Sequence, residues 1–165
     1  MMLFVPKEAA NMSSFKSILL PTDFSDYSKY ARAYAISLCR EFKAKLLALH
    51  VLEDPVYPID TTPFGFSPVQ FVRERRDSAE KELEKVVEEI AKEGIETESL
   101  IVEGKPFVQI ITVAREREVD LIVIGTHGRT GLSHYLLGSV TEKVVRKAPC
   151  PVLTVRKHGQ EFVLP

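Results

Sequence analysis

The stretch that decides the fold is Leu121–Val155, LIVIGTHGRTGLSHYLLGSVTEKVVRKAPCPVLTV. It begins with four β-favouring apolar residues that end at Gly125, and a glycine-rich loop follows. Ser139 and Glu142 have the spacing of a capping box, in which the serine accepts an amide N–H and the glutamate reaches back, so a helix is predicted to begin there. A strand, a glycine loop and a helix N-terminus in this order predict a pocket of backbone N–H groups and a helix dipole, which favours an anion such as phosphate.

The rest of the chain repeats the strand–helix alternation of this stretch. Pro149 must end the last helix at Ala148, and Pro151–Val155 is predicted to be the final strand. Four further apolar runs have strand character: Ser17–Leu20, Lys45–Val51, Glu96–Val102 and Leu121–Ile124. Five strands alternating with four helices predict an α/β fold, an open parallel sheet with helices on both faces.

The predicted helices are amphipathic. Ser25 is a plausible N-cap for the first helix, Gly94 a C-cap for the second, and Pro106 begins the third. The apolar stripe of the first helix is Tyr27, Tyr30, Ala31, Tyr34, Leu38 and Phe42. That of the second, Val69–Glu93, is Val72, Ala79, Leu83, Val86, Val87 and Ile90, and that of the third is Phe107, Ile110, Ile111 and Ala114. The basic run Arg73–Arg76 alternates with acidic residues, which predicts a solvated helix face rather than a nucleic-acid patch.

Composition indicates one globular domain, residues 15–156, with an N-terminal extension at 1–14 and a C-terminal tail at 157–165. The 165 residues carry a net charge of −1, which argues against broad binding to nucleic acid or membrane surfaces. Cys39 and Cys150 have no metal-binding spacing and are predicted to be free thiols. No apolar run is long enough to span a membrane, and the N-terminus lacks the features of a signal peptide, so we expect a cytoplasmic protein.

One segment departs from the alternation. Glu53–Pro68 holds four prolines and three aromatic residues between a predicted strand and a predicted helix. A loop of this length inside a compact domain is usually functional or disordered. Either a packed flap or an unstructured linker fits this composition.

Two loops are expected to form one crevice. Ligands of open parallel sheets bind beyond the carboxyl ends of strands where the strand order reverses, and Pro21–Asp23 and Gly125–Ser139 follow two strands that would be adjacent there. Glycines in the second loop would adopt left-handed conformations and let the backbone approach phosphate oxygens. His127, Arg129 and His134 can add positive charge nearby. The alternative, that these glycines only shape a turn and Ser139 only caps a helix, is less favoured because four glycines and a capped helix occur in one loop.

The sequence gives weaker evidence for other residues that could bind a ligand or a metal or take part in catalysis. Asp23 is either a turn or capping residue or an acceptor for a sugar hydroxyl or base amine. His50, in an apolar strand, is predicted to be a hydrogen-bonded core residue. His127 and His134 have no carboxylate partner in register, so a metal site between them is not expected, and no nucleophile–base triad is present. The GxxxxGK[ST] phosphate loop and the GxGxxG dinucleotide motif are both absent, so phosphate binding must use another design.

The glycine pattern resembles that of a known family. Gly125-x2-Gly128-x9-Gly138-Ser139, together with ILLPTDFS, LALHV and DLIVIGTHGRTG, is similar to the signature of the universal stress protein family. The resemblance covers Phe15 to Arg156. It implies a five-stranded Rossmann-like sheet of order 3-2-1-4-5, usually homodimeric, and ATP as the ligand, often with Mg²⁺ or Mn²⁺.

By that resemblance, each site residue receives a role. Asp23 and the main chain of Val51 would hold adenine, with Pro21 and Thr22 lining that end. Ribose and phosphates would be wrapped by Gly125, Thr126, His127, Gly128, Arg129, Thr130 and Gly131, and the triphosphate end would be closed by Gly138, Ser139, Val140 and Thr141. A dimer would form by pairing of the apolar edge strand Pro151–Val155 with its copy, which removes an aggregation-prone edge.

Three functions remain open from the sequence. The first is an ATP-dependent switch or sensor in stress response that acts with a protein partner. The second is a slow ATPase or phosphoryl-transfer enzyme, although no residue is identified as a base to activate water. The third is a dimerisation module that binds no nucleotide.

Overall fold

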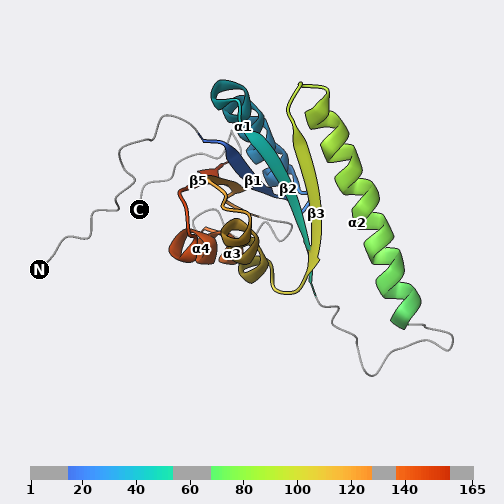
Figure 1. Cartoon of the computed structure of the whole chain (residues 1–165). Helices are drawn as coiled ribbons and strands as arrows, with labels where there is room; N and C mark the ends of the chain where they lie inside the picture. The colour runs from blue at the N-terminus through green and yellow to red at the C-terminus, as the bar shows by residue number, and fades with distance from the viewer. Residues whose placement is uncertain (1–14, 54–67, 128–136, 157–165) are drawn as a thin grey trace, which may run out of the picture.

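Five parallel strands form one sheet in the order β3-β2-β1-β4-β5, which confirms the predicted topology (Figure 1). The computed structural model describes residues 15–53, 68–127 and 137–156. Its strands are β1 (Ser17–Pro21), β2 (Lys45–Leu52), β3 (Thr97–Glu103), β4 (Leu121–Gly125) and β5 (Val152–Val155). Its helices are α1 (Asp26–Phe42), α2 (Pro68–Ala91), α3 (Pro106–Glu116) and α4 (Ser139–Lys147). The predictions for the Glu53–Pro68 loop, for Gly128–Gly131 and His134, and for both termini lie outside the described residues, except at Glu53 and Pro68 themselves.

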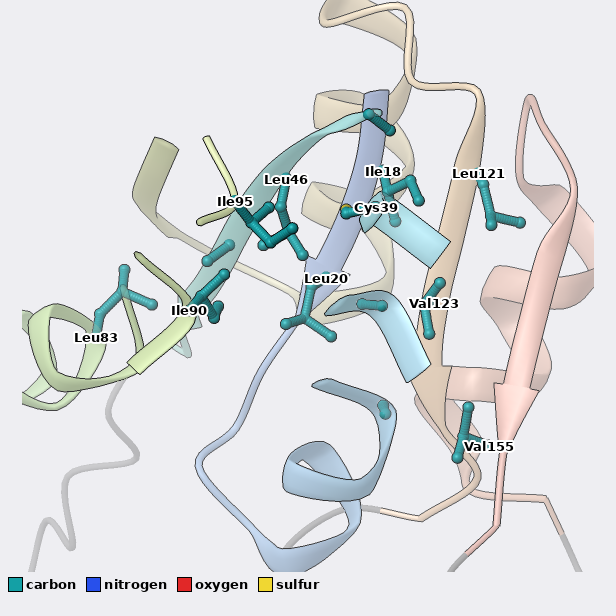
Figure 2. Packing of buried hydrophobic residues seen from close by; sticks show 14 residues of the cluster. Ile18, Leu20, Cys39, Leu46, Leu83, Ile90, Ile95, Leu121, Val123 and Val155 are labelled. Atoms are coloured by element: carbon teal, nitrogen blue, oxygen red, sulfur yellow. The ribbon is translucent and has the colours of Figure 1, made fainter. Parts of the chain in front are cut away.

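Strand alternation places two apolar cores on the two faces of the sheet. Ile18 and Leu20 of β1 point toward α1 and α2, whereas Leu19 between them points toward α3 and α4. All three side chains are completely buried, as expected for an interior strand of a parallel sheet. Figure 2 shows the first of these cores, in which Leu20 faces Ile90 of α2 and Val123 of β4.

The buried faces of the helices differ in detail from the predicted stripes. On α1 the buried residues are Ser28, Ala31, Ala35 and Cys39, while the predicted Tyr34 is 43% exposed. Small side chains at this face let α1 lie close to the sheet, and the tyrosines are displaced to its flanks. Val72 of α2 is also exposed. In α3, Val113 is buried although the predicted stripe lacks it.

Helix ends follow the predicted chemistry at most positions. The side chain of Ser25 accepts a hydrogen bond from the N–H of Ser28, which confirms the N-cap of α1. Pro106 is the first residue of α3, and α4 stops before Pro149. Gly94 has a φ of +75°, and its N–H donates to the carbonyl of Ala91, so it terminates α2 in the left-handed conformation that glycine favours. No helix in the described ranges is long and apolar enough to cross a membrane.

Both cysteines are free thiols in protected positions, as predicted. Burial raises the pKa of the Cys39 thiol from 9.0 to about 11. Burial also raises the pKa of Cys150 to about 11, with a further contribution from the charge of Asp120 that outweighs the opposing hydrogen bond from the backbone of Ile122. The thiolate is the reactive form, so both residues are chemically quiet at neutral pH.

We therefore expect slow alkylation of Cys39 and Cys150 by iodoacetamide at pH 8 in the folded protein. A rise in pKa of two units lowers the thiolate fraction about 100-fold, and mass spectrometry of timed samples measures the rate against the same protein in guanidinium chloride. Since the folded pKa values are raised, the stability from protonated thiols is present below pH 9 and is lost as the pH rises through 11. Alkylation of either folded cysteine at the unfolded rate would contradict this assignment.

Candidate functional site

A cavity of about 560 Å³ opens at the carboxyl ends of the strands, where β1 lies between β2 and β4 and the strand order reverses. The structure brings ten of the predicted site residues to its wall: Pro21, Thr22, Asp23, Val51, Gly125, His127, Gly138, Ser139, Val140 and Thr141. Thr126 is buried behind this wall. Gly128, Arg129, Thr130 and Gly131 lie outside the described residues. The two loops expected to face each other therefore do so across one cavity.

The loop after β1 is fixed by hydrogen bonds through Thr22. The N–H of Thr22 donates to the carbonyl of Leu49 on β2 at 2.8 Å, and its own carbonyl accepts from Nδ1 of His50, also at 2.8 Å. Its hydroxyl donates to Oγ of Ser28 and accepts from the N–H of Phe24, each at 3.1 Å. These contacts join the ends of β1 and β2 to the first turn of α1.

Asp23 has the first of the two roles that the sequence left open, that of a turn residue beside the helix cap. Its Oδ1 accepts from the N–H of Ser25 at 3.1 Å and from the Ser25 hydroxyl at 2.6 Å, which orients the residue that caps α1. The same side chain lines the cavity. The capping role is thus a feature of the structure, and it presents a carboxylate to the crevice.

His50 is buried and hydrogen-bonded, as predicted for a core histidine, but it also lines the cavity. Its ring stacks on that of Phe24 with 4.3 Å between centroids and 25° between planes. Phe24 has a φ of +65°, a left-handed conformation that costs a residue with a side chain about 1 kcal/mol. The stack and the Thr22 bond oppose that cost and keep the first loop in place.

The predicted capping box at the start of α4 is wrong. Gly138 is the N-cap, Ser139 is the first helical residue, and no side chain bonds to the cap. Glu142 instead lies 3.1 Å from Arg146 in an ion pair. The first helical bond runs from Glu142 N to Gly138 O, so within the described part of the chain the N–H groups of Ser139, Val140 and Thr141 have no acceptor. Uncapped amides at a helix N-terminus favour an anion.

Two hydrogen bonds fasten this helix start to the end of β4. The Thr141 hydroxyl donates to the carbonyl of Gly125 at 2.8 Å, and the N–H of Gly138 donates to the carbonyl of Thr126 at 2.8 Å. Thr141 is the third residue of α4, and its bond holds the first turn of the helix against the end of β4. This tertiary contact explains the shift from the predicted cap.

The two signature glycines that the structure describes, Gly125 and Gly138, serve close packing rather than a left-handed backbone. Gly125 and Gly138 are not among the described residues with positive φ, which corrects the expectation from the sequence. A Cβ on Gly125 would lie 3.0 Å from the carbonyl oxygen of Tyr27 in α1, and one on Gly138 would lie 3.1 Å from that of Thr126. Both glycines let backbone segments approach each other at the cavity wall.

His127 contributes a buried polar atom at the α4 side of the cavity. Its Nδ1 is 3.1 Å from Oγ1 of Thr126, and its ring lies against that of Tyr27 with 5.2 Å between centroids. The residue is 8% exposed, and its Nε2 is the buried side-chain N or O atom that lacks a hydrogen-bond partner among the described residues. An unpaired buried nitrogen costs about 1–3 kcal/mol unless a ligand satisfies it.

The sequence missed a third wall of the cavity. Arg75, Ser78, Ala79 and Glu82 lie on one face of α2 at spacings of three and four, and all four line the cavity. The prediction of a solvated face for Arg73–Arg76 is therefore wrong for Arg75, which is half-buried. The available signal was its helical spacing from Ala79, which belongs to the buried stripe. The remaining missed lining residues are Phe24, Ser28, Leu49, His50, Leu52, Glu53, Pro106, Ile110 and Ile124.

Charge is distributed unevenly along the crevice. The lining that follows β2 or belongs to α2 includes Glu53, Glu82 and Arg75, and Asp23 follows β1 between β2 and β4. Near α4 the described lining has no carboxylate and presents amides, hydroxyls and His127. A ligand with an anionic end is thus favoured with that end toward α4. No cluster of three metal-binding side chains exists among the described residues.

A family model and a curated relative both relate this chain to the same protein family. The model of the universal stress protein family matches residues 14–156. Universal stress protein MJ0531 of Methanocaldococcus jannaschii is 37% identical over 155 residues, covering 89% of this chain and 85% of its own length.

Two solved structures share the fold. Protein MJ0577 of the same organism has a TM-score of 0.77 and 30% identity, with 88% of this chain and 98% of that chain covered. A universal stress protein from Archaeoglobus fulgidus, solved in complex with dAMP, has a TM-score of 0.63 and 25% identity, with coverage of 85% and 97%.

Proposed function

The chain belongs to the universal stress protein family, and we propose that its crevice binds an adenine nucleotide, ATP in the cell, as the input of a stress-response switch. The observation that carries this proposal is the α4 side of the cavity. Three helix-start amides and the Nε2 of His127, which have no hydrogen-bond partner among the described residues, line or flank the same space. Phosphate oxygens satisfy both kinds of group.

The other end of the crevice fits a base. Val51 and Asp23 lie at the ends of neighbouring strands β2 and β1, and they offer a strand backbone and a carboxylate to an exocyclic amine and ring nitrogens. The acidic character of this end disfavours phosphate there. The relative bound to dAMP supports an adenine nucleotide as the ligand class.

A divalent cation would accompany the nucleotide through its phosphates. Mg²⁺ usually keeps several waters and takes phosphate oxygens with one or two protein ligands. The described residues at the α4 end offer hydroxyls, such as that of Ser139, and no carboxylate. Binding of Mg²⁺ or Mn²⁺ is thus proposed only as part of the nucleotide complex.

The same geometry favours binding over rapid hydrolysis. The described carboxylates that line the cavity belong to α2 or follow β1 and β2, whereas the amides of α4 follow β4. Oδ1 of Asp23 is already engaged by Ser25. A base to activate water beside the terminal phosphate is therefore not provided by the described carboxylates, which supports a switch or sensor that acts through a protein partner.

We also propose that the switch is a homodimer paired through β5. This strand is at the edge of the sheet, and Leu153 on it is 36% exposed. Val145 on the neighbouring helix α4 is 47% exposed. Antiparallel pairing with a second copy would complete the edge and cover this apolar surface.

Isothermal titration calorimetry with ATP, AMP and GTP, each with and without Mg²⁺, tests the proposal. We expect one adenine nucleotide per chain, with a Kd on the order of 1–100 μM, and weaker binding of GTP. Absence of binding by every nucleotide at 1 mM would overturn the proposal and favour a dimerisation module. Turnover of ATP near a typical enzyme value of about 10 s⁻¹ would instead indicate an ATPase.

A further inference from the structure

Arg75 differs from its basic neighbours on α2. Arg76 is exposed and forms ion pairs with Glu80 at 3.1 Å and Glu103 at 2.9 Å. Arg75 is half-buried, lines the cavity, and has no ion-pair partner within residues 15–53, 68–127 and 137–156. A guanidinium that lines a cavity and has no carboxylate partner in the described part of the chain is a candidate group for contact with a ligand.

Two contacts hold the guanidinium at the end of β2. Its Nη1 donates to the backbone carbonyl of Glu53 at 3.3 Å, just past the last residue of the strand. Its Cζ lies 5.8 Å from the centroid of the Phe71 ring, one turn earlier on α2. These contacts place the charged group over the β2 side of the crevice while leaving further N–H groups and the planar face of the guanidinium for a ligand.

The position of Arg75 separates it from the phosphate end. β2 and β4 flank β1 on opposite sides, and neighbouring strands are about 4.8 Å apart, so the ends of β2 and β4 are separated by about 10 Å. The helix-start amides of α4 follow β4 in the chain, whereas Arg75 donates to the carbonyl of Glu53, the residue just past β2. Arg75 therefore lies at the β2 side of the cavity, next to the end of the strand that carries Val51, where we place the base.

We propose that Arg75 stacks its guanidinium on the purine ring of the bound nucleotide and acts as a specificity-determining residue. This inference rests on the proposed function. Guanidinium groups are planar, weakly hydrated and stack well on aromatic faces. Asp23 and Val51 would engage the edge of the base, and Arg75 would cover its face, so the base would be held in two perpendicular directions.

Arg75→Ala is expected to weaken binding of ATP and of adenosine about tenfold, and to leave competition by inorganic tripolyphosphate unchanged. Arg75→Lys keeps the positive charge but lacks the planar guanidinium. We expect it to lose most of the same affinity for ATP and adenosine. Arg76→Ala is the matched control, because it removes an arginine from the adjacent position outside the cavity and should leave all three affinities unchanged. Calorimetry and competition assays measure these values, and circular dichroism checks the fold.

Arg75→Trp gives a direct optical test. The chain contains no tryptophan, so the substituted ring supplies the whole tryptophan emission. We expect ATP and adenosine to quench that emission by stacking, with affinity near that of the unmodified protein, and tripolyphosphate to leave it unchanged.

The outcomes separate this inference from the proposed function. Equal ATP affinity in the wild type and Arg75→Ala, with no quenching in Arg75→Trp, would overturn the stacking role while leaving nucleotide binding intact. Loss of tripolyphosphate binding in Arg75→Ala would overturn it in favour of a phosphate contact. Absence of ATP binding in the wild type would overturn both.

Discussion

Gly125→Val is expected to lower the free energy of unfolding by about 2–3 kcal/mol. An added Cβ would lie 3.0 Å from the carbonyl oxygen of Tyr27 and 3.1 Å from its carbonyl carbon, which are backbone atoms in the first turn of α1. Backbone cannot rotate away as a flexible side chain does, so α1 must shift or β4 must bend. Either change also separates the two loops of the crevice, and we expect ATP affinity to fall with stability.

The measurement is urea unfolding and calorimetric melting of the variant beside the wild type. A loss of this size in a chain of 165 residues corresponds to a decrease in Tm of about 4–12 °C. Gly125→Ala is the graded control. Its single methyl group meets the same atoms, but the smaller entropy of the unfolded alanine chain opposes the loss by about 0.5–1 kcal/mol. A Tm for Gly125→Val equal to that of the wild type would show that α1 is not seated on β4 as described.

The sheet and its order were predictable because their determinants are local and redundant. The apolar runs of β1, β2 and β4 are each bounded by turn residues, and the two prolines that flank Cys150 separate α4 from β5. Such patterns specify strands buried on both faces. The boundaries in the structure differ from the predicted ones by one or two residues, as at Leu52 and Ala91.

The details of the site depended on contacts that no local pattern contains. Ser139 and Gly138 are both acceptable N-cap residues. The choice of Gly138 is associated with the bond from the Thr141 hydroxyl to Gly125, which is 16 positions away in sequence. Likewise, the helical spacing of Arg75 from Ala79 indicated that it lies near the buried stripe, but its place in the cavity wall depended on the position of α2 over the end of β2. Pairings between distant segments thus decide which members of a polar run face a ligand.

The glycines also show that a local sequence pattern does not identify contacts between distant segments. Their number and spacing indicated a backbone approaching an anion, but at Gly125 and Gly138 the approaching atoms belong to the protein itself. A pattern of glycines marks where a side chain is excluded without identifying what excludes it. In the function that we propose, the amides that follow Gly138 contact the ligand at this end instead.

Ser139→Pro is expected to weaken ATP binding about 10–100-fold while the protein stays folded. The substitution removes the N–H of Ser139, and a hydrogen bond to a charged group contributes about 1.5–3 kcal/mol. Ser139 is the first residue of α4, where a proline is tolerated because that N–H has no partner in the helix. Gly138 has a φ of −56° and a ψ of 143°, the extended conformation that a residue before proline prefers. The variant therefore deletes one backbone donor with little effect on the fold.

Ser139→Ala is the matched control, since it removes the hydroxyl and keeps the amide. We expect it to lose no more than about fivefold in affinity, corresponding to about 1 kcal/mol for one neutral donor. Calorimetry with ATP measures both variants, and melting curves verify that each is folded. If folded Ser139→Pro binds ATP as tightly as the wild type, the start of α4 does not hold the phosphates. If both variants lose equally, the hydroxyl rather than the backbone is the donor, and the helix N-terminus is then only the scaffold that presents it.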